Sequence, residues 1–233
     1  MPYTLLTLTQ AAELLGISPG DIRALVVQGE LQAEDRGGNL LFSREELDLW
    51  TSRQLVTGRL QRGNAPLKPL AQRRIFPTLS ELCPPECVCA ALPGTTRASI
   101  IRELTALADK SGFLYDPNDL MEEIARREEQ GSTNIGNGIA IPHTLVRDEG
   151  FFSQSFVCLA RLERPSFFNS AEDGRPTELL ILSCSSDSEE HLNILRQISG
   201  LCRHTRFPER FREAETDAEL LEALRISERE ILA

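Results

Sequence analysis

Residues 131–143 read GSTNIGNGIAIPH, and this stretch says most about the domain that contains it. We expect a helix to end at Gly131, because glycine readily adopts the backbone angles that close a helix. The glycine-rich segment that follows leaves backbone N–H groups free to face an anion. A short apolar run, Ile139 to Ile141, comes next, and Pro142 then fixes the chain immediately before His143.

A histidine held in this way is a candidate nucleophile for phosphoryl transfer. It must be neutral to attack phosphorus, and an ordinary histidine titrates near neutral pH. The reaction needs positioning and charge stabilisation, and Arg127 offers a permanently charged, planar fork for phosphate oxygens. The sequence contains neither a P-loop nor a GxGxxG pattern, so it does not resemble a nucleotide-dependent kinase. Further phosphate-binding candidates are the hydroxyls of Ser132 and Thr133 and the backbone at Gly136 and Gly138.

The segments GST (131–133) and GNGIAIPH (136–143) resemble the active-site signature of phosphotransferase enzyme IIA of the fructose–mannitol type, especially its nitrogen-regulatory branch. The resemblance runs from Phe76 to the C-terminus. It implies an α/β fold with a mixed sheet flanked by helices. It also implies that His143 is phosphorylated by a phosphohistidine carrier of the HPr type. The protein would then be a phosphocarrier rather than a free-standing enzyme.

Two further residues match positions of that family's site. Arg127, in an Arg-Glu-x-x-Gly-Ser-Thr segment, matches the arginine beside the active histidine, and His191, in His-Leu-x-x-Leu, matches the second active-site histidine. Three positions depart from the family pattern: Asn134 replaces a usual glycine, Thr144 a small residue, and Asn169 a usual acid. The changes at 134 and 144 remove no catalytic group, and we attach no role to Asn169.

Apolar spacing predicts the other elements of this domain. Strands that alternate with helices indicate an α/β sandwich over residues 76–233. Glu122, Glu123 and Glu128 are expected on the water-facing side of their helix. The expected helices cover 96–111, the stretch after Asp116-Pro117, 188–203, 206–214 and 217–227, and the expected strands cover 156–162 and 178–183.

The first fifty-four residues predict a small winged helix-turn-helix domain. Thr9 can cap a first helix, which Gly16 ends, and Ser18-Pro19 has the favoured order for opening a second. Two short apolar pieces at 31–33 and 40–42, joined through a Gly-Gly pair, indicate a hairpin.

A third helix should begin at Ser43, with Glu46 completing a capping box and Trp50 on the apolar face. This order of elements, with Leu8-Thr9, Ile17-Ser18-Pro19 and the Gly-Gly pair, resembles the excisionase-like and MerR-like small DNA-binding domains. The resemblance covers about fifty residues and implies a nucleic-acid-binding surface.

Charge argues against a simple assignment of this domain to DNA. Phosphate contacts need cations, and residues 1–50 carry eight acidic residues against three arginines. DNA binding and a protein-docking or dimerisation role therefore both stay open. The candidate nucleic-acid-binding residues are Arg23, Arg36 and Arg53.

The charge changes sharply after the first domain. The whole chain has a formal net charge of −10, yet residues 51–75 contain six Lys and Arg and no acidic residue. Prolines and glycines in the same stretch are typical of a linker. We therefore predict three parts: a winged helix-turn-helix domain at 1–54, a basic linker at 55–75 and an enzyme IIA-like domain at 76–233.

Composition excludes several classes of protein. No apolar string is long enough to span a bilayer and the start does not resemble a signal peptide, so we expect a cytoplasmic protein without membrane insertion. Cys83, Cys87 and Cys89 lack the paired CxxC spacing of zinc ribbons, which favours small buried hydrophobes over a metal site. We predict neither a metal nor a cofactor.

Three functions are compatible with these observations. The leading hypothesis is a regulatory phosphocarrier of the phosphoenolpyruvate-dependent system, which accepts phosphate on His143 and couples it to DNA or a target protein. The second is a sugar-transport enzyme IIA that donates to a separate IIB. The third is a DNA-binding regulator whose IIA-like domain is an unphosphorylated sensor. A homodimer is compatible with each, because helix-turn-helix regulators often pair.

Overall fold

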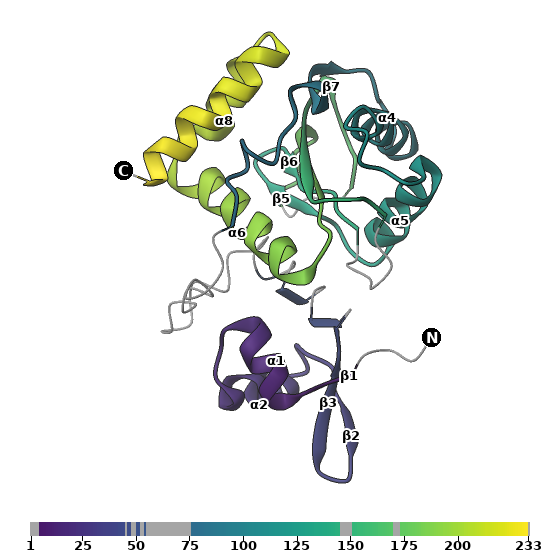
Figure 1. Cartoon of the computed structure of the whole chain (residues 1–233), viewed down its shortest axis with the longest axis vertical. Helices are drawn as coiled ribbons and strands as arrows, with labels where there is room; N and C mark the ends of the chain where they lie inside the picture. Colours follow the sequence, from purple (N-terminus) through teal and green to yellow (C-terminus); the bar gives the residue numbers. More distant parts are fainter. Residues whose placement is uncertain are drawn as a thin grey trace. The chain divides into compact units, whose positions relative to one another are not determined.

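The computed structural model of the protein describes residues 5–44, 46–47, 50–51, 54, 76–144, 151–169 and 173–232 (Figure 1). Two compact units emerge, one ending at Phe76 and the other beginning at Pro77. Each unit encloses its own hydrophobic core. The predicted linker at 55–75 and the candidate Arg53 lie outside the described residues.

The described part of the N-terminal unit combines two helices, helical residues of a third and a small sheet, in agreement with the predicted winged helix-turn-helix domain. Gly16, in the left-handed region with φ 65°, makes the turn between the helices. Apolar side chains of both helices and of the last strand, among them Ile22 and Phe42, form the core. The elements are α1 (Leu8–Leu15), α2 (Pro19–Val27), β1 (Leu5–Thr7), β2 (Glu34–Arg36) and β3 (Asn39–Ser43), with antiparallel strand order β1-β3-β2.

The predicted cap of the first helix is wrong by two residues. Thr7, not Thr9, is the N-cap of α1, because Gln10 completes a reciprocal capping box with it. Ser18 caps α2 as predicted, with Asp21 as its partner.

The hairpin of this unit also begins later than predicted. Leu31 is buried in the core rather than in a strand, and β2 starts at Glu34. The two-residue turn Gly37-Gly38, with both φ values positive, sets the pairing of Arg36 with Asn39. The predicted cap of the third helix is confirmed, because the Glu46 N–H donates to Ser43 Oγ at 3.3 Å and residues 44, 46–47, 50–51 and 54 are helical.

The C-terminal unit is an α/β sandwich around a five-stranded mixed sheet, which confirms the predicted fold class. The strand order is β4-β7-β8-β6-β5. Helices α4 and α5 cover one face of the sheet, and α6 and α8 lie on the other (Figure 1). The strands are β4 (Val88–Leu92), β5 (Asn134–Gly136), β6 (Ile139–Ala140), β7 (Phe156–Ser166) and β8 (Thr177–Cys184). The helices are α4 (Arg97–Asp109), α5 (Pro117–Glu129), α6 (Ser188–His204), α7 (Phe207–Glu213) and α8 (Asp217–Leu232), and the 3₁₀ turn η2 spans Pro85–Cys87.

Side-chain alternation along the central strands explains why both faces are covered. Successive residues of β8 point to opposite faces, so Leu180, Leu182 and Cys184 join the core beneath α4 and α5. The alternate residues Leu179, Ile181 and Ser183, which are also buried, turn to the opposite face. Cys83 and Cys87 are buried, as the hydrophobic interpretation expects, whereas Cys89 is half-buried.

The sheet also brings the candidate residues together. Strand β6 runs parallel to β8, and His143 continues this pairing as an isolated bridge to Ser183. The chain then leaves β8 and enters α6 at Ser188. His191 in the first turn of α6 is thereby placed next to the end of the β6 segment. None of the helices among the described residues is long and apolar enough to cross a bilayer.

Candidate phosphoryl-transfer site

Three buried side chains from three elements meet at the end of the sheet. Arg127 lies in the last turn of α5, His143 follows β6, and His191 lies in the first turn of α6. Each is 1% exposed. The two imidazole rings have centroids 5.1 Å apart and planes tilted by 48°. The structure therefore brings together the three residues that the sequence nominates as catalytic.

The hydrogen bonds of His143 define one tautomer of its ring. Nε of Arg127 donates to Nε2 of His143 at 3.0 Å, so Nε2 carries a lone pair. Nδ1 lies 2.8 Å from the carbonyl oxygen of Ile141, which can accept only, so Nδ1 carries the proton. His143 is thus a neutral imidazole whose Nε2 is available as a nucleophile.

Electrostatics favour the same neutral form. Burial, with added effects of Arg127 and His191, holds the pKa of His143 well below its usual value of 6.5. The hydrogen bond to Ile141 acts in the opposite direction and is the smallest contribution. A neutral nucleophile at ordinary pH follows.

His191 is a second neutral imidazole at this site. Burial, followed by the charge of Arg127, lowers its pKa to about 3. Its Nδ1 lies 3.5 Å from Oγ of Ser185, which is 3.1 Å from Oγ of Ser183. Ser183 and Ser185 thus orient the ring of His191. The sequence alone does not identify these two serines as site residues.

Arg127 is fixed from behind as well as at the histidine. Its Nη1 donates to the carbonyl oxygen of Gly131 at 2.9 Å, immediately after the end of α5. A buried guanidinium bonded in two directions has little freedom to reorient. It therefore presents a permanent positive charge at Nε2 of His143.

The two hydroxyl candidates behave differently. Oγ of Ser132, which is half-buried, accepts from the N–H of Asn134 at 3.1 Å, so its own O–H can be donated to another group. Thr133 is fully buried, and its hydroxyl donates to Glu128. Ser132 therefore keeps a hydroxyl proton that it can donate, whereas the hydroxyl of Thr133 is used within the local structure.

The glycines of the signature lie elsewhere. Gly136 and Gly138 flank Asn137 in the turn between β5 and β6, with φ values of 82° and 72°. From Gly138 the chain runs extended alongside β8 to His143, five residues or about 16 Å away. The structure does not bring these glycines to the histidine, and we assign them to the turn.

The prediction that Glu128 faces water is wrong. Glu128 is only 2% exposed. Its carboxylate accepts hydrogen bonds from Thr133 and, at 2.7 Å, from Nδ2 of Asn169. The end of α5 packs against the following segment, which turns this face inward. Glu128 and Asn169 are parts of the site region that sequence reasoning missed; the departure at 169 from the family pattern was the available signal.

The other departures are also buried. Nδ2 of Asn134 donates to Oγ1 of Thr177 at 3.0 Å, and its Oδ1 accepts from the N–H of Gly136 at 2.8 Å. Asn134 therefore stabilises the β5–β6 turn. Thr144 is 2% exposed and directly follows His143.

In the N-terminal unit, the two nucleic-acid candidates that the structure describes, Arg23 and Arg36, lie on the surface. Arg23 is exposed on α2, and Arg36 in β2 makes an ion pair with Glu34, with Nε 2.9 Å from Oε1. Val27 at the end of α2 is 87% exposed. The outer surface of the second helix is therefore short of cations and partly apolar.

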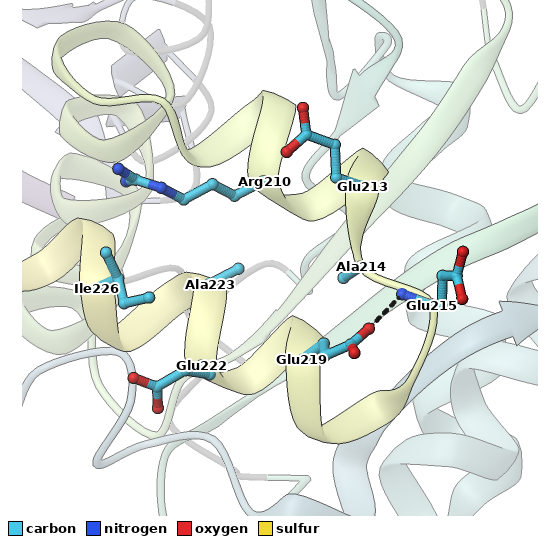
Figure 2. A pocket seen from close by; sticks show the side chains of 8 residues that line it. All are labelled: Arg210, Glu213, Ala214, Glu215, Glu219, Glu222, Ala223 and Ile226. Carbon is cyan, nitrogen blue, oxygen red and sulfur yellow. Dashed lines mark hydrogen bonds between the residues drawn. The ribbon is translucent and has the colours of Figure 1, made fainter.

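A hollow between α7 and α8 provides a contrast with the histidine site. It measures about 370 Å³, and Figure 2 shows Glu213, Glu215, Glu219 and Glu222 around it. Arg210 also lines the hollow but is paired with Glu230, so the four carboxylates would repel a phosphate. None of the predicted site residues lines this hollow. Among the described residues, no group of three or more His, Cys, Asp or Glu side chains could hold a metal ion.

Comparison with solved structures identifies the class of fold. The chain superposes on nitrogen regulatory protein IIA-Ntr from Neisseria meningitidis with a TM-score of 0.55 and 23% identity, over 62% of this chain and 97% of that one. It superposes on IIA mannitol from Escherichia coli with a TM-score of 0.51 and 21% identity, over 59% and 96%. The C-terminal unit therefore has the fold of enzyme IIA domains.

Sequence comparison identifies the family. The profile described as phosphoenolpyruvate-dependent sugar phosphotransferase system, EIIA 2, matches residues 81–226, and the chain belongs to this family. A helix-turn-helix domain profile matches residues 5–55. A nitrogen regulatory protein of Pseudomonas aeruginosa is 33% identical over 140 residues, covering 59% of this chain and 88% of the relative. A fructose-specific EIIA component of Haloferax volcanii is 30% identical with the same coverage.

Proposed function

We propose that the C-terminal unit is a regulatory phosphocarrier that accepts a phosphoryl group on Nε2 of His143 from an HPr-type phosphohistidine protein. The observation that carries this proposal is the Nε2 lone pair, held by Arg127 at 3.0 Å in a buried site. The family match supports the same chemistry. The relatives described as nitrogen regulatory proteins support a regulatory role.

The proposed transfer needs no group beyond the donor and these side chains. The Nε2 lone pair forms the new N–P bond while the P–N bond to the donor histidine breaks, and the leaving electron pair stays on the donor nitrogen. As the phosphoryl group approaches, Nε–H of Arg127 passes its hydrogen bond from Nε2 to a phosphoryl oxygen, which frees the lone pair for the attack. The proton stays on Nδ1 and is donated to the carbonyl oxygen of Ile141, which stabilises the positive charge of the phosphorylated ring. His191 and the Ser132 hydroxyl supply neutral donors to the phosphoryl oxygens.

Phosphorylation would change the charge at a buried position. A phosphoryl group adds about −1.5 to −2 charges near neutral pH, by analogy with other phosphorylated side chains. The added charge is a signal to which a regulatory partner can respond.

A sugar-transport role is the second candidate. The fructose-specific EIIA relative favours it. In addition, a solved complex of enzyme IIA mannitol with phosphorylated IIB mannitol contains the same fold, at a TM-score of 0.51 and 20% identity. In this role the phosphoryl group on His143 passes to a separate IIB protein.

For the N-terminal unit we propose a protein partner rather than DNA. The pairing of Arg36 with Glu34 removes one of its few cations from phosphate binding, and Val27 exposes an apolar side chain on α2. The helix-turn-helix match leaves DNA as the alternative. A salt-dependent shift of DNA by the full chain that is lost in Arg23→Ala would favour DNA.

The test of the carrier function is intact mass. The chain is incubated with phosphoenolpyruvate, enzyme I and an HPr-type carrier, and His143→Ala is treated in parallel. The proposal predicts one acid-labile phosphoryl group on the wild type and none on the variant. No gain in mass, with carriers active on another acceptor, would leave a binding module on an enzyme IIA fold.

A further inference from the structure

Glu128 accepts hydrogen bonds at both oxygens of a buried carboxylate. Oε1 accepts from Oγ1 of Thr133, and Oε2 accepts from the Thr133 N–H at 3.4 Å and from Nδ2 of Asn169 at 2.7 Å. Asn169 Nδ2 also donates to the backbone oxygen of Glu128 at 3.2 Å. The carboxylate therefore ties the end of α5 to two segments that follow it.

From this carboxylate, two short routes lead to the two nitrogens of His143. The first passes through Gly131, whose carbonyl oxygen accepts from Arg127 at 2.9 Å, and Arg127 donates to Nε2. The second passes through Thr133, whose carbonyl oxygen accepts from the N–H of Ile141 at 3.0 Å. The carbonyl oxygen of Ile141 then accepts from Nδ1 of His143 at 2.8 Å. Gly131 and Thr133 belong to the same short segment that Glu128 fixes.

We propose that Glu128 is a positioning residue for phosphoryl transfer: it fixes residues 131–133 so that Arg127 meets Nε2 of His143 and Ile141 holds Nδ1. It does not touch the phosphoryl group. The rate part of this inference rests on the carrier function proposed above.

Asn169 is the matched partner of Glu128. An amide donates to the carboxylate at any pH, whereas an aspartate at the same place can do so only when one of the two carboxyl groups is protonated. The polarity of this contact can therefore be reversed experimentally. In the double variant Glu128→Gln/Asn169→Asp, the new glutamine amide donates to the new carboxylate and its oxygen still accepts from Thr133.

The experiment uses the full chain with four variants. These are Glu128→Gln, Asn169→Asp, the double variant, and Glu228→Gln as the control. Glu228 lies on α8, outside the histidine site, and is also a buried carboxylate, 8% exposed. It accepts a hydrogen bond from the N–H of Ser80 at 3.0 Å. Three quantities are measured: the single-turnover rate of phosphoryl transfer from phosphorylated HPr, the ¹⁵N shifts of the His143 ring, and the midpoint of thermal unfolding.

We expect each single variant at the Glu128–Asn169 contact to transfer about 10- to 100-fold more slowly, because a misplacement of about 1 Å has effects of this size. The ¹⁵N shifts of Nε2 and Nδ1 should change with the rate. The double variant should recover part of the rate and the shifts, and Glu228→Gln should change the unfolding midpoint without changing either.

Two results would overturn the inference. One is wild-type transfer and wild-type ring shifts in Glu128→Gln. The other is a slow Glu128→Gln with unchanged ring shifts and no recovery in the double variant. If the wild type itself takes no phosphate, the carrier function fails, but the ring shifts still decide whether Glu128 positions His143.

Discussion

The two units of this chain each carry candidate arginines, and the two sets differ in what surrounds them. Arg127 in the C-terminal unit is buried and bonded to His143 and to the Gly131 carbonyl. Arg23 and Arg36 in the N-terminal unit lie at the surface, and Arg36 is paired with an acid of its own strand. The difference shows that an arginine contributes to a site only when hydrogen-bond partners fix its position. We therefore expect larger effects from substitutions in the buried histidine site than from substitutions on the exposed N-terminal unit.

The largest effect is expected for Arg127→Lys. A lysine cannot donate in two fixed directions, so transfer to His143 should slow by about 100-fold. The measurement is the single-turnover rate from phosphorylated HPr.

Arg161→Lys is the matched control for this arginine. Arg161 also donates in two directions, to the carbonyl oxygens of Ala90 and Arg212 at 2.9 Å each, but it does not contact the histidines. Equal slowing by both variants would contradict the special role of Arg127.

The second effect concerns pH and stability. His191 has a pKa of about 3 when folded and about 6.5 when unfolded, so the unfolded chain binds more protons between these values. The free energy of unfolding should therefore fall as pH drops below about 6.5, by about 2 kcal/mol at pH 5 from His191 alone. The pKa of His143 is shifted in the same direction and adds to the loss.

Denaturant titrations at pH 7 and pH 5 measure this difference, with His191→Gln as comparison. The variant should be less sensitive to acid than the wild type. An unchanged pH dependence would mean that the ring of His191 is not buried in its neutral form.

A third, smaller effect separates the two ends of the signature stretch. Gly138 has φ 72°, and a Cβ there would lie 3.1 Å from the carbonyl oxygen of Pro176. Gly138→Ala should lower the free energy of unfolding by about 1–2 kcal/mol because a left-handed backbone disfavours alanine. The folded Gly138→Ala variant should still transfer phosphate at the wild-type rate. A large loss of rate would mean that Gly138 takes part in phosphate binding, contrary to its assignment to the turn.

The smallest effect on stability is expected for Val27→Asp in the N-terminal unit. Val27 is 87% exposed, so its replacement should change the free energy of unfolding by about 0.5 kcal/mol or less. It should nevertheless weaken association of the full chain with a protein partner, including a second copy. Sedimentation velocity of the wild type, Val27→Asp and Arg23→Ala measures this association. DNA binding that Arg23→Ala abolishes and Val27→Asp does not would favour DNA over a protein partner.

Much of the fold could be predicted because its long segments have clear periodicity. The stretches at 156–162 and 178–183 were predicted as strands, and the structure extends them into β7 and β8. Strands β5 and β6 contain three and two residues, too few for a period to show. Strand β1 could not be predicted for the same reason, because it has three residues and is defined by its pairing with β3.

The candidate site could be predicted as a set of residues but not as a network. Motif positions nominated Arg127, His143 and His191, and the structure brings them together. The role of Ile141 depends on a backbone carbonyl, which no residue type reveals. The sequence predicts an exposed Glu128 because charged residues usually face solvent. Its burial depends on hydrogen-bond donors from segments that fold against α5, which the sequence pattern does not reveal.

The central claim is that Nε2 of His143 receives the phosphoryl group. The direct measurement is NMR of the phosphorylated chain with ¹⁵N-labelled histidine, which locates the N–P bond by ³¹P–¹⁵N coupling. The account predicts a single coupled nitrogen, Nε2 of His143, absent in His143→Ala. Coupling at Nδ1, or at a nitrogen of His191, would contradict it.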